Sequence, residues 1–505
     1  MGPIGEHLGL RIVYLSREAD DSSPLYTYKF MLGREMDGGI DATTRSDRWG
    51  YPVRTASDAC IAAIDAYYDQ VLAYGRDRAV ILRAARHDPS CVLANALSAH
   101  FLAGKDPAES SRLLGAASDS LDNATPYEGA VFGAISCLMA YDRDDDLAVD
   151  RHFELLKEFP KDLLSLKRAQ TLCFYMGRPD LSLNLVQEVL VYNKDQSYIY
   201  GMLSFPLLEL GRMADAEGAA RKGLGINSCD LWSQHNLCHV LQYECHFEEA
   251  VKFMETCSST WNSCSSFMYT HNWWHVAVCY LEGDSPLDKV LEVYDHCIWK
   301  ELERSDAEPA EVYVNALALL MRIYVRDHMH HIAERLMLLA NVFKDESMWH
   351  VEWHLDILAL WALASTKETS KAEGLLKSIK SRFSLMSRKK QQQMQSAIRL
   401  AEAIYEYGRG NFQSVFDLLG PDFDATGFKM IGASDEQLDV FNEVWYIVLL
   451  NIGQFSKVIE EVKKQVCKRG APFLWQLLEK AYSMEGRSDA PLAGERAKVL
   501  EAASK

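Results

Sequence analysis

The sequence HNLCH at residues 235–239 recurs as HNWWH at residues 271–275, 36 residues further along the chain. The two histidines of each copy are four residues apart, so on a helix both rings project from one face. A spacing of 36 residues is close to the period of a repeated pair of helices. The stretch therefore predicts two neighbouring helices that bring four histidines to one patch, with the rest of the chain as their scaffold.

A 34-residue register precedes and includes the first copy. A tetratricopeptide repeat has this length and consists of two antiparallel helices, with a small residue where the helices pack closely. Small residues recur every 34 residues at Ala148, Ser182, Ala216 and Ala250, and the turn glycines Gly177 and Gly211 have the same spacing. The clearest repeats are expected at about 129–162, 163–196, 197–230 and 231–264.

Helical periodicity continues from Thr55 to the end of the chain, with almost no strand signal. The register loosens after the fourth repeat, and further turns are expected at Gly283-Asp284, Arg326-Asp327, 365–368, 408–411 and Gly453-Gln454. We predict an all-α fold over residues 51–505, a right-handed superhelical solenoid of tetratricopeptide-like helical hairpins. Residues 1–50 carry turn-forming segments and are expected to be an irregular N-terminal extension.

Composition excludes several classes of function. The 505 residues have a net charge of −18, which argues against nucleic acid as a partner because a nucleic-acid binder needs a basic face. No apolar run has the length of a membrane span, and the first 20 residues lack the apolar core of a signal peptide. The twelve cysteines contain no C-x-x-C pair and are expected to be reduced. A cytoplasmic protein without a membrane partner is predicted.

Three interpretations of the histidines compete. In the first they are hydrogen-bonded polar residues that face a groove and fix helix packing. In the second they hold a divalent metal, since neutral imidazoles at i and i+4 are a common zinc arrangement. Asn236 and Asn272 stand where a metalloprotease motif has its glutamate, so that mechanism is absent. Further ligands would then come from acidic residues such as Asp295, Glu352 or Asp356.

The third interpretation is acid–base or nucleophilic chemistry without a metal. Histidines near their ordinary pKa are suitable proton carriers at neutral pH. Asp295 or Glu352 would orient them, and Cys238 or Cys279 would lie nearby. Nothing in the spacing of the cysteines marks one of them as a nucleophile.

The central stretch resembles the tetratricopeptide repeat protein 38 family. The resemblance spans about residues 45 to 480, and its most specific part is His271-Asn272-Trp274-His275 followed by Tyr294-Asp295. It is also carried by Trp232, His235, His239, Glu249-Ala250, Phe253-Met254 and Trp261, with weaker matches at Tyr51-Pro52, Asp88-Pro89, Asn315–Ile323 with Arg322, and His354. It implies a superhelical repeat protein, without an activity that we can name.

Two departures from the family pattern bear on the patch. The family tends to have Asp where this chain has Asn315, and His where this chain has Cys297. If the family's patch is catalytic, these changes alter it here. With the resemblance included, the candidate ligand-binding residues are Trp232, Asn272, Trp274, Tyr294 and His354.

Two hypotheses for function follow. The first is a tetratricopeptide-like protein that binds a partner peptide or a small-molecule ligand in a concave groove lined by histidine and tryptophan. The second is an enzyme of hydrolase or lyase type, with or without a divalent metal. In that case His271 and His275 are the acid–base or metal-binding groups and His235 and His239 are their partners. Asp295 would orient one imidazole, and Asn272 would hold a carbonyl or an oxyanion.

Overall fold

The computed structural model describes residues 43–141 and 143–503, so most of the expected N-terminal extension lies outside the described residues. The described chain is all-α apart from one antiparallel hairpin of β1 (Thr44–Ser46) and β2 (Pro52–Arg54). The predicted fold class is therefore confirmed at the level of an all-α protein.

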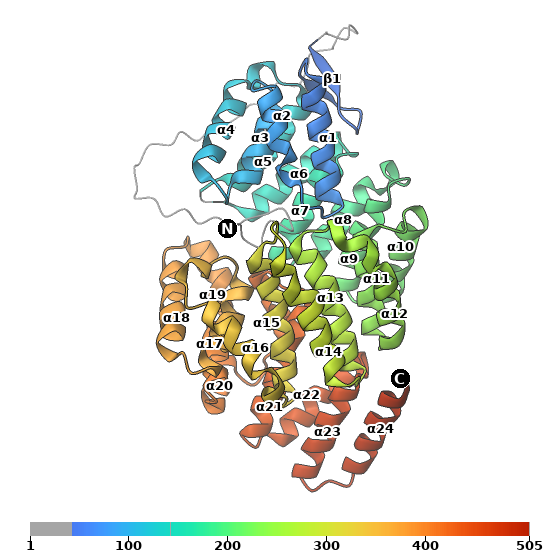
Figure 1. Cartoon of the computed structure of the whole chain (residues 1–505), viewed down its shortest axis with the longest axis vertical. Helices are drawn as coiled ribbons and strands as arrows, with labels where there is room; N and C mark the ends of the chain where they lie inside the picture. Colours follow the sequence, from blue (N-terminus) through green and yellow to red (C-terminus); the bar gives the residue numbers. More distant parts are fainter. Residues whose placement is uncertain (1–42, 142, 504–505) are drawn as a thin grey trace. The chain divides into compact units, whose positions relative to one another are not determined.

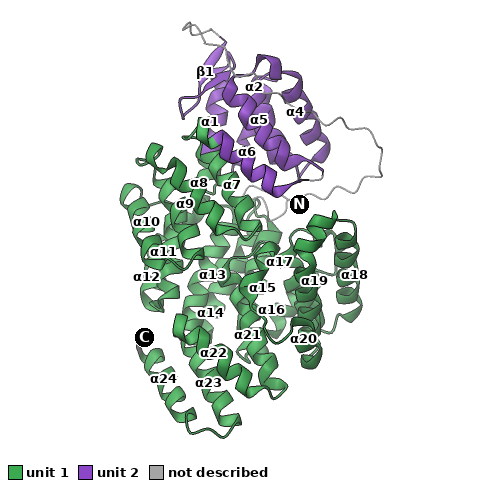
Figure 2. Cartoon of the chain, turned by 180° about the vertical axis from the view of Figure 1, so that it is seen from behind, with its two compact units in different colours: residues 1–10, 69–76, 156–505 green, residues 11–68, 77–155 purple. Residues whose placement is uncertain are grey.

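The chain divides into two compact units (Figure 2). Among the described residues, unit 2 comprises 43–68 and 77–155, and unit 1 comprises 69–76 and 156–503. The sequence suggested a boundary near residue 50 and one continuous array beyond it. The contacts group the first helices with the β-hairpin.

Unit 2 contains the hairpin and the first helices. The boundary between unit 2 and unit 1 falls within α1, after Tyr68. Its helices are α1 (Asp58–Leu72), η2 (Arg78–Val80), α2 (Ile81–His87), α3 (Val92–Leu102), α4 (Pro107–Asp119), η3 (Leu121–Asn123), α5 (Pro126–Met139) and α6 (Asp145–Glu158).

Unit 1 contains the remaining helices, which Figure 1 labels along the chain. They are α7 (Leu163–Tyr175), α8 (Pro179–Val189), η4 (Leu190–Tyr192), α9 (Ser197–Glu209), α10 (Met213–Ile226), α11 (Leu231–Tyr243), α12 (Phe247–Cys257), η5 (Ser258–Ser263), α13 (Ser266–Glu282), α14 (Leu287–Val293), η6 (Tyr294–Ile298), η7 (Trp299–Glu303), α15 (Pro309–Val325), α16 (Met329–Val342), η8 (Glu346–Met348), α17 (Trp353–Ser365), α18 (Thr369–Ser384), α19 (Arg388–Gly408), α20 (Phe412–Leu419), η9 (Ala425–Ile431), α21 (Asp435–Asn451), α22 (Phe455–Lys468), α23 (Pro472–Met484) and α24 (Ala490–Ala503).

The 34-residue register corresponds to real helix positions. The four small residues all occupy the fourth position of their helices, α6, α8, α10 and α12, and all four are buried. A small side chain at this position lets the backbone of the neighbouring helix approach closely. Three of the predicted repeats begin at the first residue of α7, α9 and α11.

In unit 1, each turn between paired helices contains one residue with a left-handed backbone. Gly177 and Gly211 adopt φ of 64° and 73°, a conformation that glycine tolerates best. Later turns use other residues at this position. The left-handed residues of these turns are Gly177, Gly211, Cys245, Asp284, Asp327, Lys367, Gly410, Gly453 and Gly486. The turns predicted after the fourth repeat therefore fall where the structure has them.

Alternate helices of unit 1 pack against one another. Figure 1 shows α11, α13 and α15 side by side, and each contacts the next. α15 also contacts α21, a helix from much later in the chain. Glu436 of α21 lies 2.7 Å from His239 of α11 and 3.4 Å from His275 of α13, so the start of α21 lies against the faces that carry the histidines. None of the described helices has the length and apolar character needed to cross a membrane.

A buried cluster of four histidines

The four histidines of the two HNxxH copies converge. His235 and His239 project from α11, and His271 and His275 project from α13. One ring nitrogen of each lies within 4.8 Å of the corresponding nitrogen of the others. The rings are buried, with exposed fractions of 1%, 7%, 4% and 0% in chain order.

Aromatic rings support the cluster. The indole of Trp232 stacks on His235 with ring centroids 4.8 Å apart, and Trp274 stacks on His271 at 5.2 Å. Phe267 also stacks on His271, at 4.9 Å. The rings of His239 and His275 meet edge to face, with 4.4 Å between their centroids. These contacts restrict the rotation of the imidazoles.

Three of the rings are oriented by amide oxygens. The Nδ1 atoms of His235, His271 and His275 lie 3.1, 2.9 and 3.2 Å from oxygens of Asn272, Asn315 and Gln242. An amide oxygen can only accept, so each Nδ1 carries the hydrogen and donates it. The lone pair of each neutral ring is therefore on Nε2.

The orientation of two of these amides is fixed by their own hydrogen bonds. The Nδ2 of Asn315 donates to Thr270 Oγ1 at 2.9 Å and to backbone oxygens of Phe267 and Glu311. The Nε2 of Gln242 donates to Glu282 Oε2 at 3.2 Å. Because the amide nitrogens are used in this way, the amide oxygens must face the histidines.

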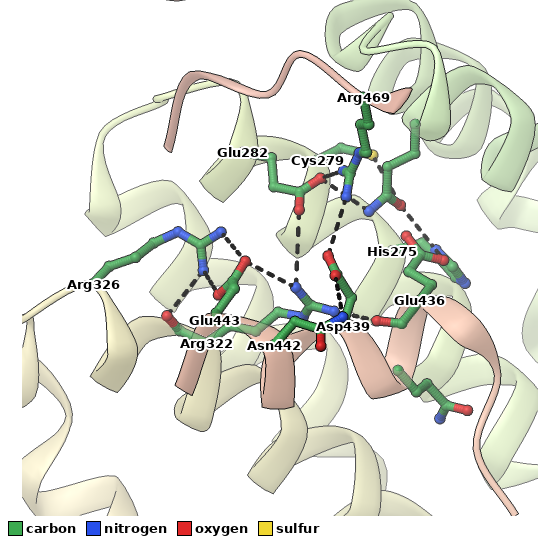
Figure 3. A network of polar contacts seen from close by, with 12 residues as sticks. His275, Cys279, Glu282, Arg322, Arg326, Glu436, Asp439, Asn442, Glu443 and Arg469 are labelled. Carbon is green, nitrogen blue, oxygen red and sulfur yellow. Dashed lines mark hydrogen bonds and ion pairs between the residues drawn. The ribbon is translucent and has the colours of Figure 1, made fainter. Parts of the chain in front are cut away.

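The fourth ring has a carboxylate partner. His239 Nδ1 lies 2.7 Å from Glu436 Oε2. The same oxygen is 3.4 Å from His275 Nδ1, and Figure 3 shows Glu436 and His275. Glu436 belongs to the first turn of α21, and its backbone oxygen accepts a hydrogen bond from Arg322. A carboxylate that holds the Nδ1 of a histidine is a frequent partner of the ligand rings in metal sites.

Two of the Nε2 atoms meet, and a third lacks a partner. Those of His235 and His239 are 3.0 Å apart, and that of His275 has no hydrogen-bond partner. Burial lowers the pKa of His271 to about 4, with the neighbouring His239 adding to the effect, and burial lowers the pKa of His235 and His275 well below the ordinary value. Neutral rings with facing lone pairs repel unless a proton or a cation lies between them. The cluster therefore has the electrostatics of a cation site.

The structure separates Asp295 from the cluster. Asp295 was expected to orient one imidazole, but its carboxylate pairs with the guanidinium of Arg335 at 2.9 and 2.6 Å. Asp295 belongs to the short π-helix Tyr294–Ile298, which follows α14 directly. Gln242, Asn272, Asn315 and Glu436 perform the orienting role instead.

The other predicted residues occupy varied places. Trp232, Trp274 and Asn272 are part of the cluster, whereas Tyr294 is buried and stacks on Trp299. His354 is buried against Phe441, and burial lowers its pKa to about 4. The Trp274 and Tyr294 side chains are 1% and 2% exposed, so neither forms an open wall for a peptide.

The thiol of Cys279, which lies nearby, is not activated. Burial, with Cys238 adjacent, raises the pKa of the Cys279 thiol well above its ordinary value. Its Sγ lies 3.7 Å from Gln242 Oε1 as a weak donor. A buried thiol of this kind is inert, because the reactive form is the thiolate.

Two functional residues were missed in the sequence for different reasons. Gln242 lies three residues after His239 on the same face of α11, so helical periodicity contained the signal that places it beside the ring. Glu436 lies in another part of the chain, and no local pattern connects it with the histidines. Only the packing of α21 brings it there.

A cavity of about 220 Å³ adjoins the cluster. Among the four histidines only His239 lines it, next to Glu436. The remaining walls come mainly from α9–α10, α21, α22 and the start of α23, and include Glu209, Met213, Tyr243, Glu282, Arg326, Asp435, Asp439, Glu443, Tyr446, Lys468, Arg469, Phe473 and Leu474. Three of the four rings are thus enclosed by the protein, and the fourth reaches open space.

No known protein-family model matches the chain. The resemblance to the tetratricopeptide repeat protein 38 family accordingly stays a prediction from the sequence.

Proposed function

We propose that this chain is a metal-binding protein in which the four histidines hold one divalent transition-metal ion, with zinc as the first candidate. One observation carries the proposal: the Nδ1 atoms of His235, His271 and His275 lie on amide oxygens and that of His239 lies 2.7 Å from Glu436 Oε2, which leaves the Nε2 atoms available to an ion. Orientation of the ligand rings by oxygen acceptors is characteristic of histidine metal sites. Imidazole nitrogen is also a preferred ligand of zinc.

The spacing of the rings suits such an ion. Zinc binds imidazole nitrogen at about 2.0–2.1 Å in a tetrahedron, which requires nitrogens roughly 3.3 Å apart. The nitrogens of His235 and His239 are 3.0 Å apart, and all the ligand nitrogens lie within 4.8 Å of one another. Small rotations of the side chains bring the set to this geometry. The carboxylate of Glu436 offsets part of the charge of the ion.

Burial argues against the rings as a docking surface for a partner protein. A peptide groove needs accessible side chains, and these four are at most 7% exposed. The interpretation of the histidines as metal ligands therefore has the better support. A site with four protein ligands and a cavity at one of them suits a small molecule more than a peptide.

We also propose that the helical hairpins are of tetratricopeptide type and stack as a superhelical array in unit 1. The shared fourth-position small residues and the left-handed turn residues support this proposal. Contacts between alternate helices from α9 to α19 support it as well.

Metal analysis of tag-free protein tests the central proposal. Protein purified without chelators is expected to contain about one equivalent of metal per chain by inductively coupled plasma mass spectrometry. The His271→Ala/His275→Ala double variant is expected to contain less than a tenth of that amount. Adding zinc to chelator-treated wild-type protein should raise its Tm, because an ion that binds only the folded state stabilises it.

The matched control is the His330→Ala/His331→Ala double variant, which removes two histidines from α16 outside the cluster. It should retain its metal. If wild-type protein binds no first-row divalent ion and is folded by circular dichroism, the proposal is overturned. A purely structural role of the cluster is then favoured.

A further inference from the structure

The cavity meets the proposed metal at a single histidine. His235, His271 and His275 do not line it, whereas His239 does and is the most exposed of the four. Zinc in catalytic sites can expand from four to five ligands. A molecule in the cavity can therefore add a donor atom to the ion beside His239 without dismantling the cluster.

The cavity has three chemically distinct walls. The first is the metal side, formed by His239 and Glu436. The second is an acidic face of α21, where carboxylates four residues apart project together as Asp435, Asp439 and Glu443. The third is apolar and is formed by Leu208, Met213, Ala471, Phe473 and Leu474.

Most of the acidic groups already have close basic partners. Both carboxylate oxygens of Glu443 are 2.9 Å from the guanidinium of Arg326, and Asp435 is 2.9 Å from Lys429 (Figure 3 shows the former). Asp439 is paired more loosely, because Arg469 is 3.6 Å from it and Asn442 Nδ2 donates to it at 3.5 Å. Asp439 therefore has the most capacity to accept hydrogen bonds from a cationic group.

We propose that the cavity binds a free amino acid with an apolar side chain. The proposal rests on the metal site proposed above. The carboxylate of the amino acid binds the metal beside His239, its ammonium group donates to Asp439, and its side chain packs on Phe473 and Leu474. The volume of about 220 Å³ suits one amino acid, since drug-sized or peptide ligands occupy roughly 300–1,000 Å³.

The three contacts are tested separately with three hydroxamates that share one metal-binding head. L-leucine hydroxamate contains all three elements, glycine hydroxamate lacks the apolar side chain, and 4-methylpentanohydroxamic acid lacks the amino group. Binding to the zinc-loaded full chain is measured by isothermal titration calorimetry. L-leucine hydroxamate is expected to bind about tenfold or more tightly than either of the others, because burial of an apolar side chain and a hydrogen bond to a charged acceptor each have that worth.

Two cavity variants test which side chain makes which contact with the amino acid. Asp439→Asn keeps the shape but removes the charge, and it is expected to reduce the preference for the amino group to less than threefold. Phe473→Ala is expected to do the same for the preference for leucine over glycine. The controls are Glu461→Gln on α22 and Trp475→Ala on α23, which lie outside the cavity lining and should preserve both preferences.

The outcomes separate this inference from the metal proposal. Protein that holds zinc but binds the three probes equally, or binds none of them, would overturn the amino-acid site and leave the metal site standing. Protein that holds no metal would overturn both. Metal content is measured again after each titration, and loss of zinc to the hydroxamate without a ternary complex would also count against the site.

Discussion

The asparagines of the two HNxxH copies have structural partners that explain their position. Asn272 of the second copy accepts from His235 of the first, and Asn236 donates to the backbone oxygen of Gly201 at 2.8 Å on the preceding helix α9. Asn315 accepts a hydrogen bond from His271 in the same way that Asn272 accepts one from His235. Each asparagine therefore links neighbouring helices, and the expected role of Asn272 in holding a substrate oxygen is not needed to account for it.

His354 gives a pH-dependent prediction. Burial lowers the pKa of His354 to about 4, so the ring is neutral in the folded chain and takes up a proton on unfolding below about pH 6.5. Its contribution is complete above pH 6.5 and is lost as the pH falls towards 4. Between pH 7 and 5, wild-type protein should lose about 2 kcal/mol more unfolding free energy than His354→Leu, as measured by urea denaturation.

Glu352 should behave in the opposite sense. Burial raises the pKa of Glu352 to about 8, although the Tyr175 hydroxyl donates to it at 3.0 Å. The folded chain keeps this carboxyl protonated where the unfolded chain ionises it, so stability is complete below about pH 4.5 and is lost as the pH rises through 8. Glu352→Gln should therefore lose less stability than wild type between pH 5 and 8. An identical urea midpoint shift in both proteins would contradict this assignment.

At the scale of elements, the left-handed turn residues offer a clean comparison. Gly211 has φ of 73° and open space where the first side-chain carbon of another residue would lie, so Gly211→Ala should cost about 1 kcal/mol from the backbone alone. Lys367 has φ of 65° and an exposed side chain, so Lys367→Gly should gain up to about 1 kcal/mol. Thermal unfolding of both variants measures the two changes in stability. A change of the same sign in both variants would contradict the explanation.

These turns also show how far the sequence could predict the elements. Glycines at 177 and 211 marked the hairpin turns because glycine is the usual residue for this conformation. The register then loosens, because Asp284, Asp327 and Lys367 follow Cys245 at intervals of 39, 43 and 40 residues, and none of them is a glycine. The helices and most turns could be predicted from periodicity, but the continuity of the pattern could not.

At the scale of the whole molecule, a buried network of charges fixes α21 against the histidine helices. Arg322 on α15 lies 3.9 Å from Glu282 on α13 and 3.4 Å from Glu443 on α21, and it is 1% exposed (Figure 3). Arg469 also pairs with Glu282 and is 3.6 Å from Asp439. Helices from three parts of unit 1 thus share one set of buried charges.

Removing the central cation should release α21. Arg322→Gln leaves two carboxylates buried with less compensation, and breaking a buried pair in this way typically costs about 3–5 kcal/mol. Hydrogen exchange followed by mass spectrometry should show faster exchange in α21 and in the histidine-bearing turns of α11 and α13. Arg487→Gln, at an exposed pair with Asp489, should change neither.

The position of α21 could not be predicted from the sequence. The convergence of the four histidines could be predicted from a four-residue spacing and a repeat period, which are local properties. The position of α21 over them could not be predicted, because it depends on a contact between α15 and α21 that no periodicity encodes. The sequence therefore predicted a groove where the structure has a buried cluster with a cavity at His239.

The late position of α21 has a consequence for biosynthesis. The ribosome completes α11 and α13 while Glu436 is still roughly 160 residues from synthesis, which at typical rates is roughly 8 to 32 s. During that interval the nascent chain presents four imidazoles without their carboxylate partner and without their cover. An ion captured then would be enclosed as α21 arrives late in synthesis, so the order of translation itself favours loading before closure.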